Sequence, residues 1–205
     1  QEELNAALAK MRAQFLPFMA QYAPAISNTR KQLELDEFLW RVETKDDVTD
    51  FTNVLAGKGD WDPVRIPHFG PPLGRAVAYY YKKIELTRDM FDRGSLFVCF
   101  KGVDYKAHVF WNGSYLGSHE GFFAPFEFNL TRAARLGENT LVVKVENDYT
   151  THGGRDEKGN RVIGNKIYAA AGPGYDDPIE GWHHCPAGMG IYQACFIESR
   201  KPLHI

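Results

Sequence analysis

The sequence predicts an all-β fold, an antiparallel two-sheet β-sandwich, and three observations in its central part support that prediction. Short apolar runs between residues 96 and 147 are separated by glycine, asparagine and proline, which leaves no room for a long helix. Within these runs apolar residues alternate with largely polar ones, as Leu141, Val143 and Val145 do. The dipeptide Asn112-Gly113 joins two β-prone runs and favours a tight two-residue turn.

The N-terminal residues predict a helix. From Glu2 to Tyr22, apolar residues recur at intervals of three and four with charged residues between them (Leu4, Leu8, Met11, Phe15, Phe18 and Tyr22). Pro17 lies within this segment and is expected to kink or split the helix. We expect the helix to pack on the sandwich, and the alternative is an interaction or linker helix.

The strands are justified by alternation and by the turn residues that bound them. Phe38, Trp40 and Val42 alternate along a first strand over Asp36–Thr44, and a polar loop with one helical turn near Val48–Leu55 follows. Further strands are expected over Trp61–Pro67, Ala76–Leu86, Leu96–Val103, Tyr105–Trp111, Ser114–His119, Phe126–Leu130 and from Ile191 onward. Another strand is expected over the alternating run Thr140–Glu146, after a turn at Leu136–Asn139.

Two of the connections between these strands have predicted conformations of their own. Residues Thr87–Gly94 are expected to form a turn or bulge. Residues Thr131–Arg135 are expected to form a single helical turn, because Thr131 is a suitable N-cap.

The composition narrows the class of protein. The chain has 205 residues, a formal net charge of -2 and 44% hydrophobic residues, which suits one soluble domain. The chain has no excess of basic residues, so its charge gives no reason to expect nucleic-acid binding. It also contains no run of 18 apolar residues, so no membrane-spanning helix is predicted. Of the three cysteines, Cys99 and Cys195 lie in predicted strands as buried small apolar residues, although one disulfide is left open.

The central motifs resemble the N-terminal sugar-binding domain of family 2 glycoside hydrolases, which include β-galactosidases, β-glucuronidases and β-mannosidases. That domain carries an ordered pattern, and its pieces all occur here in the same order. They are Gly102-Val103, Ala107-His108-Val109-Phe110-Trp111-Asn112-Gly113, Leu116-Gly117-Ser118-His119-Glu120-Gly121, Pro125-Phe126 and Gly137-Glu138-Asn139-Thr140-Leu141-Val142-Val143-Lys144-Val145.

Flanking motifs extend this resemblance to about residues 33–200. They are Trp61-Asp62-Pro63-Val64-Arg65-Ile66-Pro67-His68, Tyr80-Tyr81-Lys82-Lys83 and Gly190-Ile191-Tyr192-Gln193. Gln193 stands where the family usually has arginine. The resemblance implies a jelly-roll, galactose-binding-like sandwich. We therefore expect a helical extension over residues 1–30, the jelly-roll domain over 31–200, and the start of a linker over 201–205.

The resemblance also implies where the catalytic groups lie. In the family, both catalytic glutamates come from a later (β/α)₈ barrel, which alone exceeds this chain in length. We therefore expect no catalytic residue here and no glycosidase turnover by this chain alone. The expected function is that of a non-catalytic sugar-binding or scaffold domain of a larger glycosidase, followed by an immunoglobulin-like domain and the barrel.

The stretch 148–189 holds the candidate contact residues. It is rich in glycine, aspartate, asparagine and histidine, and loops of this length in compact domains are often functional. Sugar sites combine carboxylates for hydroxyl groups with an aromatic face for the ring. The candidate substrate-binding residues are Asp176, Asp177, Glu180, Trp182 and His183. The competing interpretation is a solvated acidic loop with Trp182 packed against the sandwich.

Metal binding is weakly indicated in the same stretch. His183, His184 and Cys185 with His152 match no ordinary four-ligand zinc spacing. Asp156, Asp176 and Asp177 are better suited to a structural calcium ion, although no cofactor is expected overall.

Two other functions compete with the main hypothesis. An autonomous carbohydrate-binding module would bind an oligosaccharide on its own, whereas an adhesion or scaffold sandwich would bind no sugar. The partners we expect are carbohydrate and the later domains of the same chain, with no nucleic acid and no membrane. A periplasmic or secreted location in a bacterium is expected, because relatives of this kind are often exported.

Overall fold

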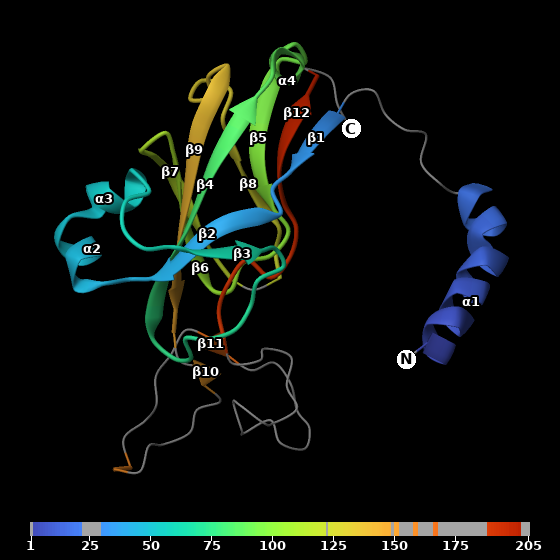
Figure 1. Ribbon diagram of the computed structural model, residues 1–205, viewed down its shortest axis with the longest axis horizontal. Coiled ribbons are helices and arrows are strands. Elements are labelled where there is room, and N and C mark those ends of the chain that lie inside the picture. Colours follow the sequence, from blue (N-terminus) through green and yellow to red (C-terminus); the bar gives the residue numbers. More distant parts are fainter. Residues whose placement is uncertain are drawn as a thin grey trace.

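The structure, a computed structural model, describes residues 2–21, 30–121, 123–148, 150–151, 158–159, 166–167 and 188–201. Two antiparallel sheets pack face to face and form a β-sandwich, with a separate helix at the N-terminus (Figure 1). The all-β prediction is therefore confirmed. Among the described helices, none combines the length and the apolar character needed to cross a membrane.

The larger sheet has six strands, and its centre is one long antiparallel pair. Strands β4 and β9 stay in register over their whole length, from Ala76 opposite Asn147 to Leu86 opposite Gly137. The order across the sheet is β3-β2-β4-β9-β6-β7. The bounds are β2 Glu37–Val42, β3 Asp62–Arg65, β4 Ala76–Leu86, β6 Lys106–Trp111, β7 Ser114–Glu120 and β9 Gly137–Asn147.

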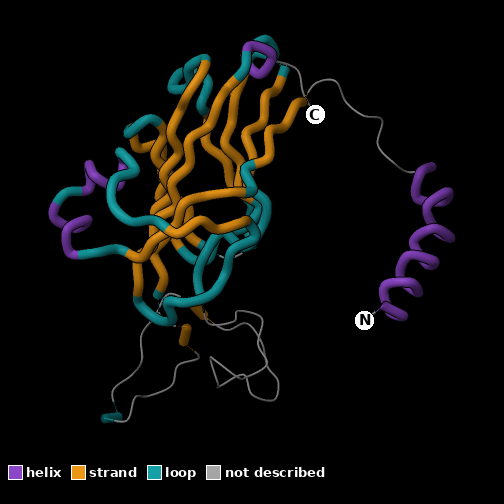
Figure 2. The backbone as a smooth tube through the Cα atoms, in the orientation of Figure 1, coloured by secondary structure: helices purple, strands orange, loops and turns teal. Residues whose placement is uncertain are grey.

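The smaller sheet has the order β1-β12-β5-β8. Figure 2 draws the strands of both sheets in orange. Its strands are β1 Arg30–Glu34, β5 Ser95–Phe100, β8 Phe126–Asn129 and β12 Cys195–Arg200. Strand β1 was not predicted as a separate strand, and it pairs with β12, near the other end of the chain. A short parallel pair, β10 Thr150–Thr151 and β11 Lys166–Ile167, completes the described strands.

The hydrophobic core lies between the two sheets. Alternation turns one face of β9 toward the core, where Leu141, Val143 and Val145 are buried. The largest fully buried side chains include Trp111, Tyr80 and Phe100. Burial of one such apolar side chain contributes roughly 1.5–3 kcal/mol to stability. The two predicted strand cysteines, Cys99 and Cys195, are buried and free.

The predicted hairpin is confirmed at the β6–β7 turn. Asn112 and Gly113 have φ angles of 50° and 79°, the left-handed values that this turn requires. The Asn112 side chain also ties the turn to the chain before and within β9. Its amide nitrogen donates to the carbonyl of Ala133 (3.2 Å) and to Asn139 Oδ1 (2.9 Å), and its oxygen accepts from the Thr140 N–H (2.9 Å).

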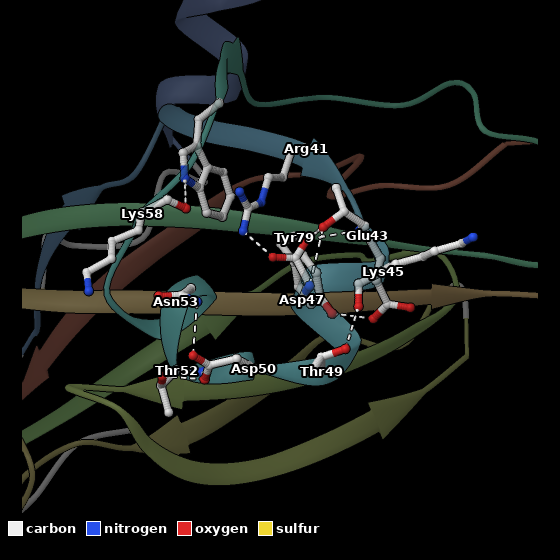
Figure 3. Close-up of polar contacts among 12 residues, drawn as sticks. Arg41, Glu43, Lys45, Asp47, Thr49, Asp50, Thr52, Asn53, Lys58 and Tyr79 are labelled. Atoms are coloured by element: carbon white, nitrogen blue, oxygen red, sulfur yellow. Dashed lines mark hydrogen bonds and ion pairs between the residues drawn. The ribbon is translucent and has the colours of Figure 1, made fainter.

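Two short helices, α2 (Lys45–Thr49) and α3 (Phe51–Leu55), cover part of the outer face of the larger sheet (Figure 3). Phe51 of α3 packs on Tyr79 and Phe110, which form a second apolar cluster with Val142. Thr44 and Asp47 make a capping box at the start of α2. The helical turn predicted near Val48–Leu55 is thus confirmed as a pair of short helices.

A buried ion pair fixes this helical cover to the sheet. Asp47 accepts hydrogen bonds from Arg41 and from the backbone of Thr44, and Arg41 stacks over Trp61 with its Cζ 4.3 Å from the ring centroid (Figure 3). Asp47 is 3% exposed, so its charge is compensated inside the protein. On the same face, the Tyr79 hydroxyl donates to Glu43.

The outer face of the smaller sheet carries charges instead of an apolar cover. Glu198 is 2% exposed and accepts hydrogen bonds from Gln32 (2.7 Å), Arg30 (2.9 Å) and Arg200. Arg200 also donates to Glu127 at 2.7 Å, and these bonds raise the pKa of its guanidinium. The charges on this face therefore neutralise one another.

The first helix, α1 (Glu2–Gln21), forms as predicted and runs through Pro17 without splitting. The prediction that it packs on the sandwich was wrong. Its side chains from residue 3 to residue 18 are all exposed, and Figure 1 shows the helix standing clear of the sheets. Periodicity reports an apolar face, but it does not say what covers that face.

Two connections differ from the predictions made for them. Residues 87–94, expected as a turn or bulge, contain the short helix α4 (Arg88–Phe91). At residues 131–135 the predicted single turn is present, since the N–H groups of Ala133 and Ala134 both donate to the Leu130 carbonyl at 2.8 Å, but Thr131 does not act as expected for its cap. The hydroxyl of Thr131 accepts from the N–H of Leu96 at 3.0 Å and so bonds to β5.

Candidate functional site

The candidate site lies at one end of the sandwich, where the chain leaves β9 at Asp148 and is described again continuously from Gly188. In Figure 1 this is the lower end, marked by β10 and β11. The predicted site residues Asp176, Asp177, Glu180, Trp182 and His183 lie outside the described residues. So do the metal candidates His152, Asp156, His184 and Cys185. The described residues do define the two stems between which they are held.

The return stem, residues 188–194, is clamped between two loops of the sandwich. On one side Met189 and Gly70 exchange two backbone hydrogen bonds (2.9 and 3.2 Å). On the other side Gly190 and Asp104 exchange two more (2.8 and 2.9 Å). The stem therefore behaves as a short strand between the loop after β3 and the loop after β5.

Glycine is required at the centre of this clamp. Gly190 has a φ of 142°, and a Cβ there would overlap the carbonyl oxygen of His68 and lie 2.8 Å from the Tyr80 hydroxyl. A Cβ at Gly102 would lie 2.7 Å from the Tyr192 ring. Close approach of the His68 backbone at Gly190 and of the Tyr192 ring at Gly102 thus explains the glycines of two motifs.

His68 and Tyr80 support the clamp from the side of the core. The Tyr80 hydroxyl accepts from the Ile191 N–H at 3.4 Å and shares a hydrogen bond of 2.7 Å with His68 Nδ1. Burial lowers the pKa of His68, which favours a neutral ring that accepts the hydroxyl proton. Trp40 packs edge-on against His68, with ring centroids 5.3 Å apart.

The departure stem is held by an ion pair. Asp148 follows the last residue of β9 and accepts from Arg75 Nε at 2.9 Å. Arg75 precedes β4, so the pair joins the two central strands at this end of the sheet. The Arg75 side chain is 61% exposed, and solvent therefore weakens this contact.

A polar hollow of about 520 Å³ opens beside the departure stem. It is lined mainly by charged and hydrogen-bonding side chains (Glu43, Arg75, Tyr105, Lys106, Glu146, Asn147 and Asp148). Burial and the nearby Glu120 carboxylate raise the pKa of Tyr105. Burial opposes ionisation of Glu146, but Lys144 holds the pKa of that carboxyl below its usual value. A hollow of this chemistry can hydrogen-bond the hydroxyl groups of a polar ligand.

Metal binding has no support within the described ranges. No group of three or more histidine, cysteine, aspartate or glutamate side chains there is arranged to hold a metal ion.

The fold and this end of the sheets define a class: a galactose-binding-like β-sandwich domain with a long segment carried at one edge. Residues 73–175, which are 103 of the 205, match the family described as glycosyl hydrolase 2 galactose-binding domain-like. The chain therefore belongs to the galactose-binding-like domains of family 2 glycoside hydrolases.

Relatives of known name are much longer than this chain. It is 33% identical over 133 residues to a β-glucuronidase of Formosa agariphila. The matched stretch covers 64% of this chain and 12% of the relative. It is 32% identical over 108 residues to a β-galactosidase of Lactococcus lactis, which covers 52% of this chain and 10% of the relative. The chain thus spans about an eighth or less of these proteins.

The solved structures agree on the fold. A β-glucuronidase from an uncultured Clostridium species superposes with a TM-score of 0.63 at 17% identity, over 87% of this chain and 30% of that one. A β-glucuronidase of Ruminococcus gnavus gives 0.61 at 14% identity. These likenesses concern the sandwich, which occupies a minor part of each larger protein.

Sequence reasoning did not identify the residues that hold the stems, namely Arg75, His68, Tyr80 and Asp104. The motifs Val64-Arg65-Ile66-Pro67-His68 and Gly190-Ile191-Tyr192 were recognised, but only as marks of resemblance. The structure adds that these two motifs contact each other through the His68 N–H and the Ile191 carbonyl (2.8 Å).

Proposed function

We propose that this chain is the non-catalytic sugar-binding and scaffold domain of a bacterial family 2 glycosidase. In this proposal an immunoglobulin-like domain and a catalytic barrel belong to the same parent protein. Membership of the family and the small share of each relative that it spans support the proposal. The parent would hydrolyse the O-glycosidic bond of a β-linked sugar.

The role we assign to the domain is to present the segment 149–187 to the substrate. The observation that carries this proposal is the two-sided clamp on the return stem, which fixes one end of that segment to the sandwich. Asp176, Asp177, Glu180, Trp182 and His183 then serve as the sugar contacts, with carboxylates for hydroxyl groups and the indole for the ring face.

Kinetics of the parent enzyme test this role. Trp182→Ala and Glu180→Ala are each expected to raise KM for a nitrophenyl glycoside by about tenfold, the cost of one lost stacking or charged hydrogen-bond contact. Arg132→Ala is the matched control, since Arg132 is exposed at the opposite end of the sandwich. Unchanged KM and kcat in both variants would remove the segment from the site.

One observation favours a second function, an autonomous carbohydrate-binding module. The polar hollow beside Arg75 and Glu146 is lined by side chains that can hydrogen-bond the hydroxyl groups of a sugar. Calorimetry of the 205-residue chain with oligosaccharides decides between the two. Measurable affinity supports the module, whereas a scaffold domain gives no heat of binding and no hydrolysis.

We also propose that the parent protein works outside the bacterial cytoplasm, in the periplasm or as a secreted enzyme. Substrates of this class reach a bacterium from outside. Fractionation of the source cells with an antibody to this chain is the test, and a cytoplasmic signal would contradict it.

A further inference from the structure

Helix α1 exposes a continuous apolar stripe. Leu4, Leu8, Met11 and Phe15 follow one another at intervals of four, three and four residues, and Phe18 continues the series. Their exposed fractions range from 36% at Leu8 to 57% at Leu4. An exposed stripe of this length marks a surface that another molecule or segment covers.

The helix needs such a cover to be stable. Most of the stability of a helix in a protein comes from packing of its apolar face, and Pro17 removes one of the hydrogen bonds of α1. The other helices in the described part of the chain have five residues or fewer, so none of them presents a face of matching length.

The apolar stripe is narrow, and its width indicates that another helix, and not a sheet, packs on it. Its residues occupy only the two heptad positions that form a coiled-coil seam, whereas a helix that packs on a sheet carries a wider apolar face. Beside the stripe lie small or polar side chains, among them Ala7, Arg12 and Gln14. Leu16 is the one large apolar side chain of residues 3–18 that lies off the stripe. A single helix of similar length fits this seam.

We propose that α1 pairs with α1 of a second copy of this chain as an antiparallel two-helix seam. In that arrangement Leu4 faces the partner's Phe15, and Leu8 faces the partner's Met11. Two-fold symmetry repeats both layers, so the four layers close on themselves. This goes beyond the proposed function, since neither sugar binding nor scaffolding of a barrel requires it.

Shape and charge favour the antiparallel direction. The two outer layers set Phe15 against the smaller Leu4, whereas a parallel pair would place Phe15 against the partner's Phe15. The helix dipoles oppose each other, which is favourable. Beside the seam Asn5 faces the partner's Arg12, so no like charges meet. Pro17 lies beyond the last layer.

Analytical ultracentrifugation of the 205-residue chain tests the proposal. The chain of 23.3 kDa is expected to sediment as a dimer at micromolar concentration. Leu8→Glu with Met11→Glu should weaken association at least about 100-fold, because it removes two apolar residues per helix and puts four charges into the seam. The double variant Ala6→Glu with Ala13→Glu adds the same charge on the opposite face and should remain dimeric.

The direction is tested by disulfide trapping. A chain with Leu8→Cys, mixed with a size-tagged chain with Met11→Cys, should cross-link between the two species under mild oxidation. A wild-type chain that stays monomeric at about 100 μM would overturn the proposal, because a dissociation constant above that value is too weak to be useful. Equal dissociation by both double variants, or cross-linking of Leu8→Cys only to itself, would do the same. The thermal midpoint of the sandwich checks that the variants are folded.

Discussion

The two stems of the segment 149–187 are fixed by different kinds of interaction. The return stem is bonded by its backbone on both sides, to Gly70 and to Asp104, and packs over the buried Tyr80 hydroxyl. The departure stem carries an ion pair between Arg75 and Asp148, and the arginine side chain of this pair is largely exposed. Dissolved salt weakens an exposed ion pair by screening its charges, whereas it has little effect on buried backbone hydrogen bonds.

This difference indicates which of the predicted sugar contacts are best positioned. His183 lies five residues before Gly188 in the sequence, whereas Asp148 is separated from Asp176 by 27 residues. A short tether to a fixed point restricts a side chain more than a long one does. We therefore expect the Trp182–His183 part of the segment to depend on the clamp.

The largest effect is expected from Gly190→Ala. The new Cβ would overlap the His68 carbonyl at a φ of 142°, and the free energy of unfolding should fall by about 3 kcal/mol. Gly113→Ala is the control, because Gly113 has a φ of 79° and no atom within 4 Å of the added group. That variant should lose only about 1 kcal/mol. Equal losses in urea denaturation would mean that the clamp is not tightly packed.

Tyr80→Phe is expected to have the next largest effect. It removes the hydroxyl that bonds His68 and Ile191 and leaves both without that partner in a buried site. The expected loss is about 1–2 kcal/mol. Tyr115→Phe removes a hydroxyl that is exposed and bonds only His108 in the described contacts, so about 0.5 kcal/mol or less is expected. The same denaturation assay measures both, and a smaller loss for Tyr80→Phe would contradict the comparison.

The clamp should also respond to pH through His68. Burial lowers the pKa of His68 in the folded state, so the unfolded chain binds its proton first as the pH falls. The stabilising contribution is therefore complete above the unfolded value near 6.5 and is lost as the pH falls through the folded value. An NMR titration should place the His68 ring below 6.5, and His68→Gln should flatten this part of the stability profile. An unchanged profile would rule out the linkage.

The smallest effect is expected at the departure stem. Arg75→Ala should change stability by about 0.5 kcal/mol or less, because the ion pair is mostly exposed. Lys83→Ala is the matched control, since it removes an exposed pair with Glu138 at the other end of the sandwich. Limited proteolysis should cut within 149–187 faster in Arg75→Ala than in Lys83→Ala. A loss as large as that of Gly190→Ala would erase the difference between the stems.

The parts of the fold that were predicted from sequence are those governed by local rules. The hairpin at Asn112-Gly113 follows from the backbone angles that this dipeptide allows, and β4 follows from 11 residues of β-prone sequence. Strand β1 was missed as a strand of its own because Arg30–Glu34 contains a single apolar residue and gains its structure by pairing with β12.

The clamp could not be predicted because backbone hydrogen bonds between distant segments leave little trace in side-chain patterns. Gly70 and Met189 are 119 positions apart in the sequence, and the fold brings them together as an antiparallel bridge. The N-cap rule failed at Thr131 for a similar reason. Its hydroxyl accepts a hydrogen bond from the Leu96 N–H, which is distant in the sequence. The proposed sugar contacts at Asp176 to His183 stay predictions.

The tied turn at Asn112 has a consequence for producing this protein. Asn112-Gly113-Ser114 fits the acceptor pattern for N-linked glycans, and the modified atom would be the side-chain nitrogen. That nitrogen already donates both of its hydrogens, to Ala133 and Asn139. A yeast or mammalian secretory host that attached an oligosaccharide there would replace one of these hydrogens and break one of the two bonds, so glycosylated material should be less stable than unmodified material.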